Sequence, residues 1–192
     1  VKNGMMSVIV HEVGHNFFPM IVNSDERQWT WMDEGLNSFL EYLALIEWDP
    51  NFPADRGPAK NIVAYMSGDQ KGLEPIMTNS ESIRQFGNNA YGKPAAALNI
   101  LRETVMGKEL FDYGFKTYAN RWKFKHPTPE DLIKTLQYHL NADLHWFVEE
   151  LIVTNKKLDY KMISHKQLED HSHAVLVKNN NKLLGLYKTG IC

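Results

Sequence analysis

The stretch "VIVHEVGHNFF" (residues 8–18) places His11, Glu12 and His15 in the spacing H-E-x-x-H. Each residue of an α-helix advances roughly 100° around the axis, so residues four apart are separated by only about 40°. The two imidazoles therefore project from one face of a helix, and both can reach one zinc ion at about 2.0–2.1 Å. Glu12 lies one step round from His11, close enough to contact a water on the metal without being a ligand. The stretch thus predicts two metal ligands and a base. The alternative is a partly buried helix whose histidines hydrogen-bond to backbone carbonyls.

The third ligand has to come from elsewhere in the chain, because zinc in hydrolases usually has three protein ligands and an open fourth position. One motif would need Gly at position 18 and His at position 21, and Phe18 and Ile21 exclude it. Another motif uses a Glu on a second helix. Glu34 lies in "WMDEGLNSFLEY" (31–42), with eighteen residues between it and His15. Alone, it would read as an exposed carboxylate at a helix start; together with the two histidines it is the predicted third ligand.

These motifs resemble the gluzincin aminopeptidase family, which includes alanyl aminopeptidases and leukotriene hydrolase. That family has H-E-x-x-H, eighteen residues and then Glu, inside W-L-N-E-G-F-A-x-Y-x-E; this chain reads "WMDEGLNSFLE" at 31–41. Thermolysin-like endopeptidases have nineteen intervening residues and a different sequence around the third ligand. The resemblance implies a zinc-dependent aminopeptidase with one Zn²⁺ per chain and peptides as substrates.

A second segment extends the resemblance. "NNAYGKPAAALNILR" (88–102) is similar to the family segment Y-x-K-G-A and the helix that follows it. The matching tyrosine of the family donates a hydrogen bond to the tetrahedral oxyanion, so the resemblance implies a catalytic role for Tyr91. Simple packing of a loop tyrosine is the alternative.

Three departures from the family pattern affect the site. The family's W-F-G-N after the second His is "FFPM" (17–20) here, and Asp33 replaces the Asn before the zinc Glu. The family's G-x-M-E-N strand lies upstream of the first His, and only ten residues precede His11. Because that strand supplies the carboxylate for the substrate's amine, no residue of this chain is assigned as amine anchor. We expect a missing upstream segment of the same protein to complete the site.

Two further carboxylates are candidate partners of the metal ligands. Glu41 lies seven residues after Glu34 on the same helix face, where it can accept the second N–H of a zinc-bound His. Asp33 either plays a similar part or favours the helix start through the helix dipole. An exposed carboxylate is the alternative for Glu41.

The pattern of apolar residues predicts a mainly α fold, and the resemblance implies that this fold is the helical part of a thermolysin-like gluzincin catalytic domain. The segment 5–18 has apolar residues on most faces and is expected to be a largely buried helix. Pro94 marks the first turn of one later helix, and Thr128 is the predicted N-cap of another. The predicted helices are 5–18, 33–47, 59–67, 94–106, 108–124, 129–140 and 143–153.

The remaining segments read as connections and strands. Residues 48–58 carry three prolines and a glycine, and 68–92 are rich in Gly, Asn and Ser, so we expect a loop and a long irregular connection. Residues 174–188 suggest two short strands around an Asn-rich turn. The expected domains are a catalytic domain over 1–155, lacking its upstream strands, and a connector with the start of a β-sandwich domain over 156–192.

Composition bears on the classes of partner that this protein can have, but it does not indicate the cellular compartment. The net charge of −2 over 192 residues gives no reason to expect nucleic acid as a partner. No apolar run approaches the roughly 18 residues of a membrane span. The single cysteine, Cys192, allows no intrachain disulfide, so the localisation stays unknown. Besides a zinc aminopeptidase, a gluzincin endopeptidase and a catalytically incompetent zinc-binding fragment or pseudo-enzyme acting as a binding module remain open.

Overall fold

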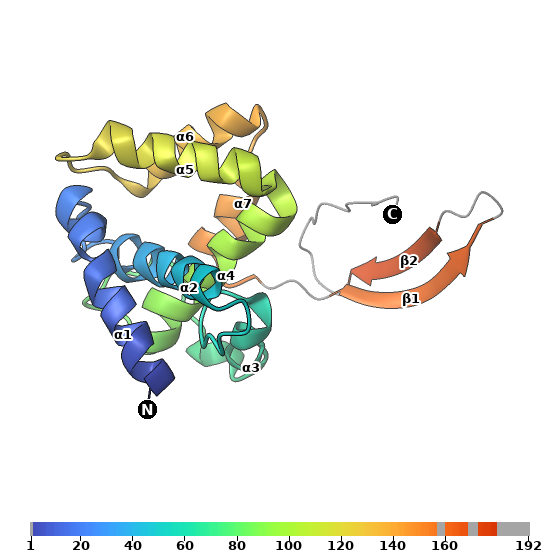
Figure 1. Cartoon of the computed structure of the whole chain (residues 1–192). Helices are drawn as coiled ribbons and strands as arrows, with labels where there is room; N and C mark the ends of the chain where they lie inside the picture. The colour runs from blue at the N-terminus through green and yellow to red at the C-terminus, as the bar shows by residue number, and fades with distance from the viewer. Residues whose placement is uncertain (1, 157–159, 169–172, 180–192) are drawn as a thin grey trace. The chain divides into compact units, whose positions relative to one another are not determined.

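The computed structural model describes residues 2–156, 160–168 and 173–179. The chain divides into two compact units, Val1–Asn155 and Lys156–Cys192. The first is built of helices and the second contains a two-stranded hairpin (Figure 1). The mainly α fold class predicted from the sequence is confirmed.

The first unit consists of α-helices and of shorter helical segments that often continue them. The α-helices are α1 (Lys2–Gly14), α2 (Leu36–Trp48), α3 (Val63–Ser67), α4 (Lys93–Ile100), α5 (Lys108–Trp122), α6 (Pro129–Leu140) and α7 (His145–Phe147). The shorter segments are η1 (Asn16–Ile21), η2 (Trp31–Gly35), η3 (Ala59–Ile62), η4 (Gln70–Gly72), η5 (Gly87–Gly92), η6 (Leu101–Met106) and η7 (Val148–Val153). The segments η2 and α2 run on from one another, so Glu34 lies in the first turns of one long helix.

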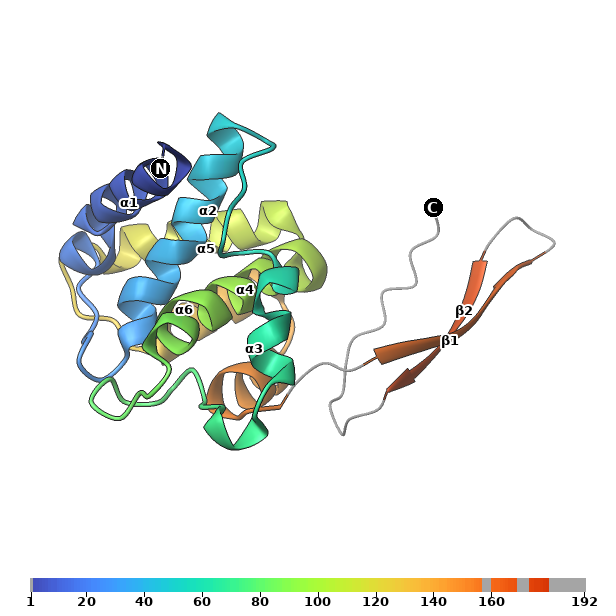
Figure 2. The same cartoon turned by 90° about the horizontal axis from the view of Figure 1, so that it is seen from below.

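Helix α2 has a central place in this unit. It packs against α1 on one side and α4 on another, and α1 and α2 lie side by side in both views (Figures 1 and 2). Beyond α4, the helices α5 and α6 pack against each other. The largest fully buried side chains form one core that joins these helices; they include Trp31, Tyr118, Phe39, Phe111, Phe147, Leu132 and Leu136. This packing fixes α1 and α2 as neighbours, and the motif residues lie on these two helices.

The expectation that the first helix is largely buried is wrong for the described residues. Among the residues of α1, His11 alone is buried. Met5, Val8, Ile9 and Val13 are exposed, with 50–59% of their surface accessible. Apolar residues on most faces predicted burial all round, but periodicity does not say what covers each face, and only the side toward α2 is packed here.

The expected irregular connection over 68–92 is wrong at its end. The helix that was predicted to begin at Pro94 begins earlier, at Gly87, and runs through η5 into α4. Tertiary hydrogen bonds explain why this Gly/Asn-rich stretch is helical: the Asn89 amide donates to Pro75 O (2.9 Å), and Lys93 Nζ donates to Glu74 O (2.9 Å). Tyr91 therefore lies on a helix and not on a loop.

The second unit contains an antiparallel hairpin of β1 (Tyr160–Gln167) and β2 (His173–Asn179). Strand β2 corresponds to the first of the two strands expected in 174–188, and the second expected strand lies outside the described residues. Strand β1 was not predicted, because "YKMISHKQ" is too polar for a strand pattern and is identified by its pairing with β2.

Among the residues that the structure describes, no helix is both long and apolar enough to span a bilayer.

Candidate metal centre

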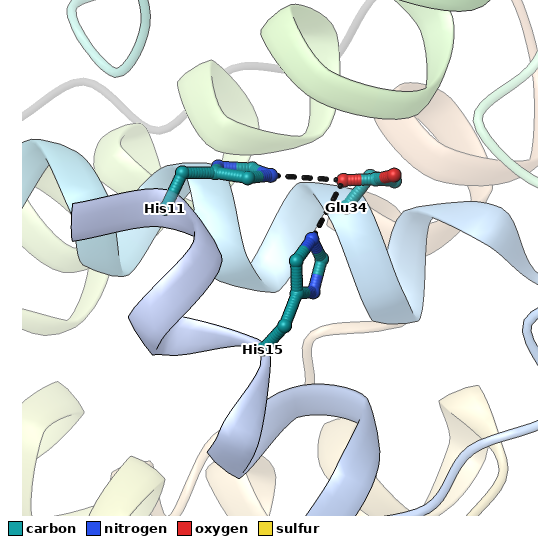
Figure 3. Close-up of side chains that lie close together, drawn as sticks. All are labelled: His11, His15 and Glu34. Carbon is teal, nitrogen blue, oxygen red and sulfur yellow. Dashed lines mark hydrogen bonds and ion pairs between the residues drawn. The ribbon is translucent and has the colours of Figure 1, made fainter. Parts of the chain in front are cut away.

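Two neighbouring helices bring three chelating side chains together (Figure 3). His11 and His15 come from α1 and its C-terminal end, and their ring centroids are 4.7 Å apart. Glu34 comes from η2, and its Oε2 atom lies 3.0 Å from His11 Nε2 and 3.4 Å from His15 Nε2. One ligand atom from each of the three residues lies within 4.8 Å of the others. The structure thus brings all three predicted metal ligands to one point.

The other ring nitrogen of each histidine is engaged by a second group. His11 Nδ1 lies 3.1 Å from Glu41 Oε2. His15 Nδ1 lies 2.9 Å from Phe18 O and 3.0 Å from Asp33 Oδ1. Since these partners are acceptors, they place a proton on each Nδ1, and each Nε2 faces the Glu34 carboxylate. Glu41 and Asp33 thus occupy the places expected for groups that orient metal-binding histidines.

The pKa values of His11 and Glu34 reflect their mutual contact. Burial of the His11 ring opposes protonation, but hydrogen bonds to Glu34 and Glu41 outweigh it and raise the pKa of His11 to about 9. Burial of Glu34 favours the neutral carboxyl, but hydrogen bonds from His11 and Tyr91 outweigh it and lower the pKa of Glu34. The carboxylate is therefore negative at neutral pH and attracts positive charge to the site.

The carboxyl group of Asp33 differs from that of its neighbour. Its burial, reinforced by the negative charge of Glu34, raises the pKa of Asp33 to about 7. Asp33, at a position where the gluzincin aminopeptidase pattern has Asn, is thus an ionisable group beside His15.

Tyr91 faces the same three residues from the helix formed by η5 and α4. Its ring stacks on that of His11 with centroids 5.7 Å apart, and its hydroxyl interacts with the Glu34 carboxylate. The guanidinium carbon of Arg56 lies 4.3 Å from the centre of the Tyr91 ring. Burial, followed by the contact with Glu34, raises the pKa of Tyr91 above its usual value, so the phenol keeps its proton at neutral pH. Tyr91 is thus a hydrogen-bond donor beside the candidate metal position.

A cavity of about 350 Å³ opens onto these groups. Glu12 lines this cavity and is exposed to solvent, whereas its neighbour His11 is buried. A carboxylate in this position is accessible to water and substrate. The residues that line the cavity and belong to the site are His11, Glu12, His15, Glu34, Glu41, Arg56 and Tyr91.

Two nitrogen atoms and one carboxylate oxygen, with the outer nitrogens fixed by acceptors, match the donor set that zinc takes in hydrolases. The residues present therefore fit a zinc ion. They can hold a metal, orient a general base and donate a hydrogen bond to a developing negative charge.

Sequence reasoning missed two residues near this centre. Arg56 follows a Pro-rich segment in which no periodic pattern predicts its position. Asn37 is fully buried in α2 and donates from Nδ2 to His11 O (2.7 Å). The available signal was the pair of polar residues within the run "LNSF" (36–39), whose four residues are all buried.

A helical fold with H-E-x-x-H on one helix, a converging Glu on the next and a tyrosine facing both defines a metallopeptidase domain of the gluzincin class. Comparison with known families agrees. The model described as "Peptidase family M1 domain" matches residues 1–151, and the chain belongs to this family.

The chain is also similar to individual members. It is 26% identical over 157 residues to a probable aminopeptidase 1 from Sulfurisphaera tokodaii, covering 79% of this chain and 20% of that protein. It is 28% identical over 143 residues to glutamyl aminopeptidase from Bos taurus, covering 71% of this chain and 15% of that protein. This chain thus spans about a fifth or less of the length of these relatives.

A solved structure shares the fold. It is the M1 zinc metallopeptidase from Deinococcus radiodurans, crystallised as a mutant bound to a Tyr-Ser-Ala substrate. The TM-score is 0.64 at 21% sequence identity, and the match covers 80% of this chain and 34% of that chain. The family model thus assigns the chain to the M1 peptidases, and the solved structure shares its fold.

Proposed function

We propose that this chain carries the zinc centre and catalytic residues of an aminopeptidase that removes residues from the N-terminus of peptides. The observation that supports this most directly is the convergence of His11 Nε2, His15 Nε2 and Glu34 Oε2 at one edge of a cavity. In this proposal, these three residues hold one zinc ion per chain. When bound, zinc lowers the pKa of a water molecule toward about 7 and polarises the scissile carbonyl.

The other residues of the site then have defined tasks. Glu12 takes a proton from the attacking water and passes it to the amine that leaves when the C–N bond breaks. Tyr91 donates a hydrogen bond to the oxyanion that forms as the water oxygen adds to the carbonyl carbon. Glu41 keeps the ring of His11 oriented through Nδ1, and the Phe18 carbonyl does the same for His15, with Asp33 in ion-pair contact with the same Nδ1.

Residues outside this chain have a part in the proposal. We propose that another segment of the parent protein supplies the carboxylate that holds the substrate's free amine, as the family resemblance implies. The lengths of the relatives, of which this chain spans a fifth or less, support it. We further propose that 1–155 is the catalytic domain and that 156–192 leads into a β domain.

The test compares two peptides of one sequence, one with a free N-terminus and one N-acetylated, with the full-length parent protein. An aminopeptidase cleaves the first after its N-terminal residue and spares the second. Internal cleavage of the acetylated peptide would instead establish a gluzincin endopeptidase. Retention of one zinc per chain without hydrolysis of either peptide would identify a binding module.

A further inference from the structure

Asn37 connects the two helices that carry the candidate ligands. It lies in α2 three residues after Glu34, and none of its surface is exposed. Its side-chain Nδ2 donates a hydrogen bond of 2.7 Å to the backbone oxygen of His11 in α1. A side chain from the helix that continues from Glu34 thus binds directly to the backbone of a histidine ligand.

The acceptor of this bond, the His11 carbonyl oxygen, also takes part in the backbone hydrogen bond that joins the two histidines. The same His11 oxygen accepts the backbone N–H of His15 at 3.2 Å. Fixing this carbonyl therefore fixes the helical turn that sets the spacing of His11 and His15. Through Asn37, that turn is placed relative to Glu34.

Gly14 provides the space for Asn37. A Cβ atom on Gly14 would lie 2.0 Å from Asn37 Oδ1 and 3.0 Å from Asn37 Cγ. A side chain at position 14 cannot coexist with this amide in its present position, so the two residues form one unit, which we call the Asn37–Gly14 clasp.

We propose that Asn37 is a positioning residue that sets the distance from the histidine pair to Glu34 through the His11 carbonyl, with Gly14 admitting its amide. This inference rests on the proposed zinc centre. It adds a residue pair that holds the metal ligands through the backbone, in addition to Glu41 and Asp33, which contact the imidazole rings.

Loss of the Asn37 amide should affect the geometry of the metal ligands more than the free energy of unfolding. Asn37 Oδ1 is buried and has no hydrogen-bond partner among the described residues, and such an oxygen offsets much of the gain from the bond that Nδ2 makes. If the His11–Asn37 bond is lost, the His11 carbonyl still accepts from His15. Removing the amide should therefore change folding little and ligand geometry more.

The experiment measures metal binding by Asn37→Ala, Gly14→Ala and the double variant in the full-length protein. For Asn37→Ala we expect zinc affinity, measured by competition with a chromogenic chelator, to fall roughly 10–100-fold, as for other groups that orient metal ligands. The visible absorption of the Co²⁺-substituted protein should shift, since it reports ligand geometry. Thr135→Ala is the matched control: Thr135 is a buried polar residue in α6 that bonds to Asp131 O, and this change should leave both readouts unchanged.

Gly14→Ala tests the shared space. Its new methyl group displaces the Asn37 amide, so we expect it to weaken zinc binding at least as much as Asn37→Ala does. The double variant should bind no more weakly than Asn37→Ala alone, because the obstacle is gone. Wild-type zinc affinity and cobalt spectrum in Asn37→Ala, or multiplicative losses in the double variant, would overturn the clasp alone. A wild-type protein that takes up no zinc would overturn the proposed metal centre as well.

Discussion

Glu34 is the residue on which both imidazoles converge, whereas Glu12 only lines the cavity beside them. Glu34→Gln replaces the negative oxygen with a neutral amide of the same size, and we expect it to lose most of the zinc.

Glu12→Gln should keep one zinc per chain and lower kcat by about 10²–10⁴-fold, because only proton transfer is removed. Metal analysis and peptidase assays of the two purified variants check both. Full zinc in the first, or full turnover in the second, would refute the assigned roles.

Lys93 gives the fold a pH dependence of its own. Burial lowers the pKa of Lys93 from its usual 10.5 to about 8. Between these values the unfolded chain binds more protons than the folded chain, so this group makes the free energy of unfolding rise as pH increases from about 8 to about 10.5. The rise is up to about 3 kcal/mol.

Lys93→Met should remove this rise, and urea unfolding at pH 7.5 and pH 9.5 measures it. Lys60→Met changes an exposed lysine instead, and it should keep the wild-type slope. An unchanged slope in Lys93→Met would show that the buried ammonium does not control it.

The residues that meet at the site differ in how far sequence predicts them. His11, His15 and Glu34 were predicted because a helix repeats its faces at fixed spacing and zinc requires a third donor. Arg56 and Asn37 were not, because their roles arise from contacts across the fold: Arg56 with the ring of Tyr91, Asn37 with a carbonyl of α1. Spacing along one element does not contain that information.

At the level of elements, the crossing of η2–α2 with α4 depends on Gly35. A Cβ atom there would lie 2.6 Å from Pro94 Cγ and 3.0 Å from Ala90 O. Gly35→Ala should separate the helix of Glu34 from that of Tyr91 and lower the free energy of unfolding by about 1–3 kcal/mol. Denaturant unfolding measures the loss. Gly4→Ala, in α1 with no atom within 4 Å, is the control and should not destabilise, because alanine is the better helix former.

Helices with amphipathic faces and clear end signals were predicted well. The structure has α5 over Lys108–Trp122 and α6 over Pro129–Leu140, close to the expected 108–124 and 129–140. In α6, the Asp131 carboxylate accepts from the backbone N–H of Thr128 (2.8 Å), a local bond that the sequence makes visible. The errors lie where contacts between distant residues determine the structure. The helix of η5 and α4 is held by side-chain hydrogen bonds to the backbone of residues 74–75. Strand β1 is defined by its pairing with β2.

At the scale of the whole chain, the exposed face of α1 predicts self-association. Met5 and Ile9 lie one turn apart and are 59% and 50% exposed, and apolar surface of this kind favours contact between molecules. The Met5→Lys/Ile9→Lys variant of the 192-residue chain should shift sedimentation toward the monomer. Tyr138→Lys removes an exposed ring from α6 and should leave the distribution unchanged. A wild-type chain that is monomeric at all concentrations would contradict this expectation.

Metal binding should also be visible in the stability of the whole helical unit. A ligand that binds only the folded state at 100 times its Kd adds about 2.7 kcal/mol to the free energy of unfolding. Removing zinc with a chelator should therefore lower the thermal midpoint of the wild type. The same treatment should leave the midpoint of Glu34→Gln unchanged. Equal effects of the chelator on both proteins would locate the metal elsewhere.

The tight meeting of position 14 with position 37 also restricts the order in which this chain can accept substitutions. While Asn37 is present, any side chain at position 14 meets its oxygen at 2.0 Å. Shortening Asn37 removes that obstacle, after which position 14 is free to gain a methyl group. A side chain gained first at position 14 therefore displaces the Asn37 amide, whereas one gained after Asn37 is shortened does not. Libraries that randomise both positions and are selected for zinc binding should therefore recover larger residues at 14 mainly in molecules that have lost Asn37.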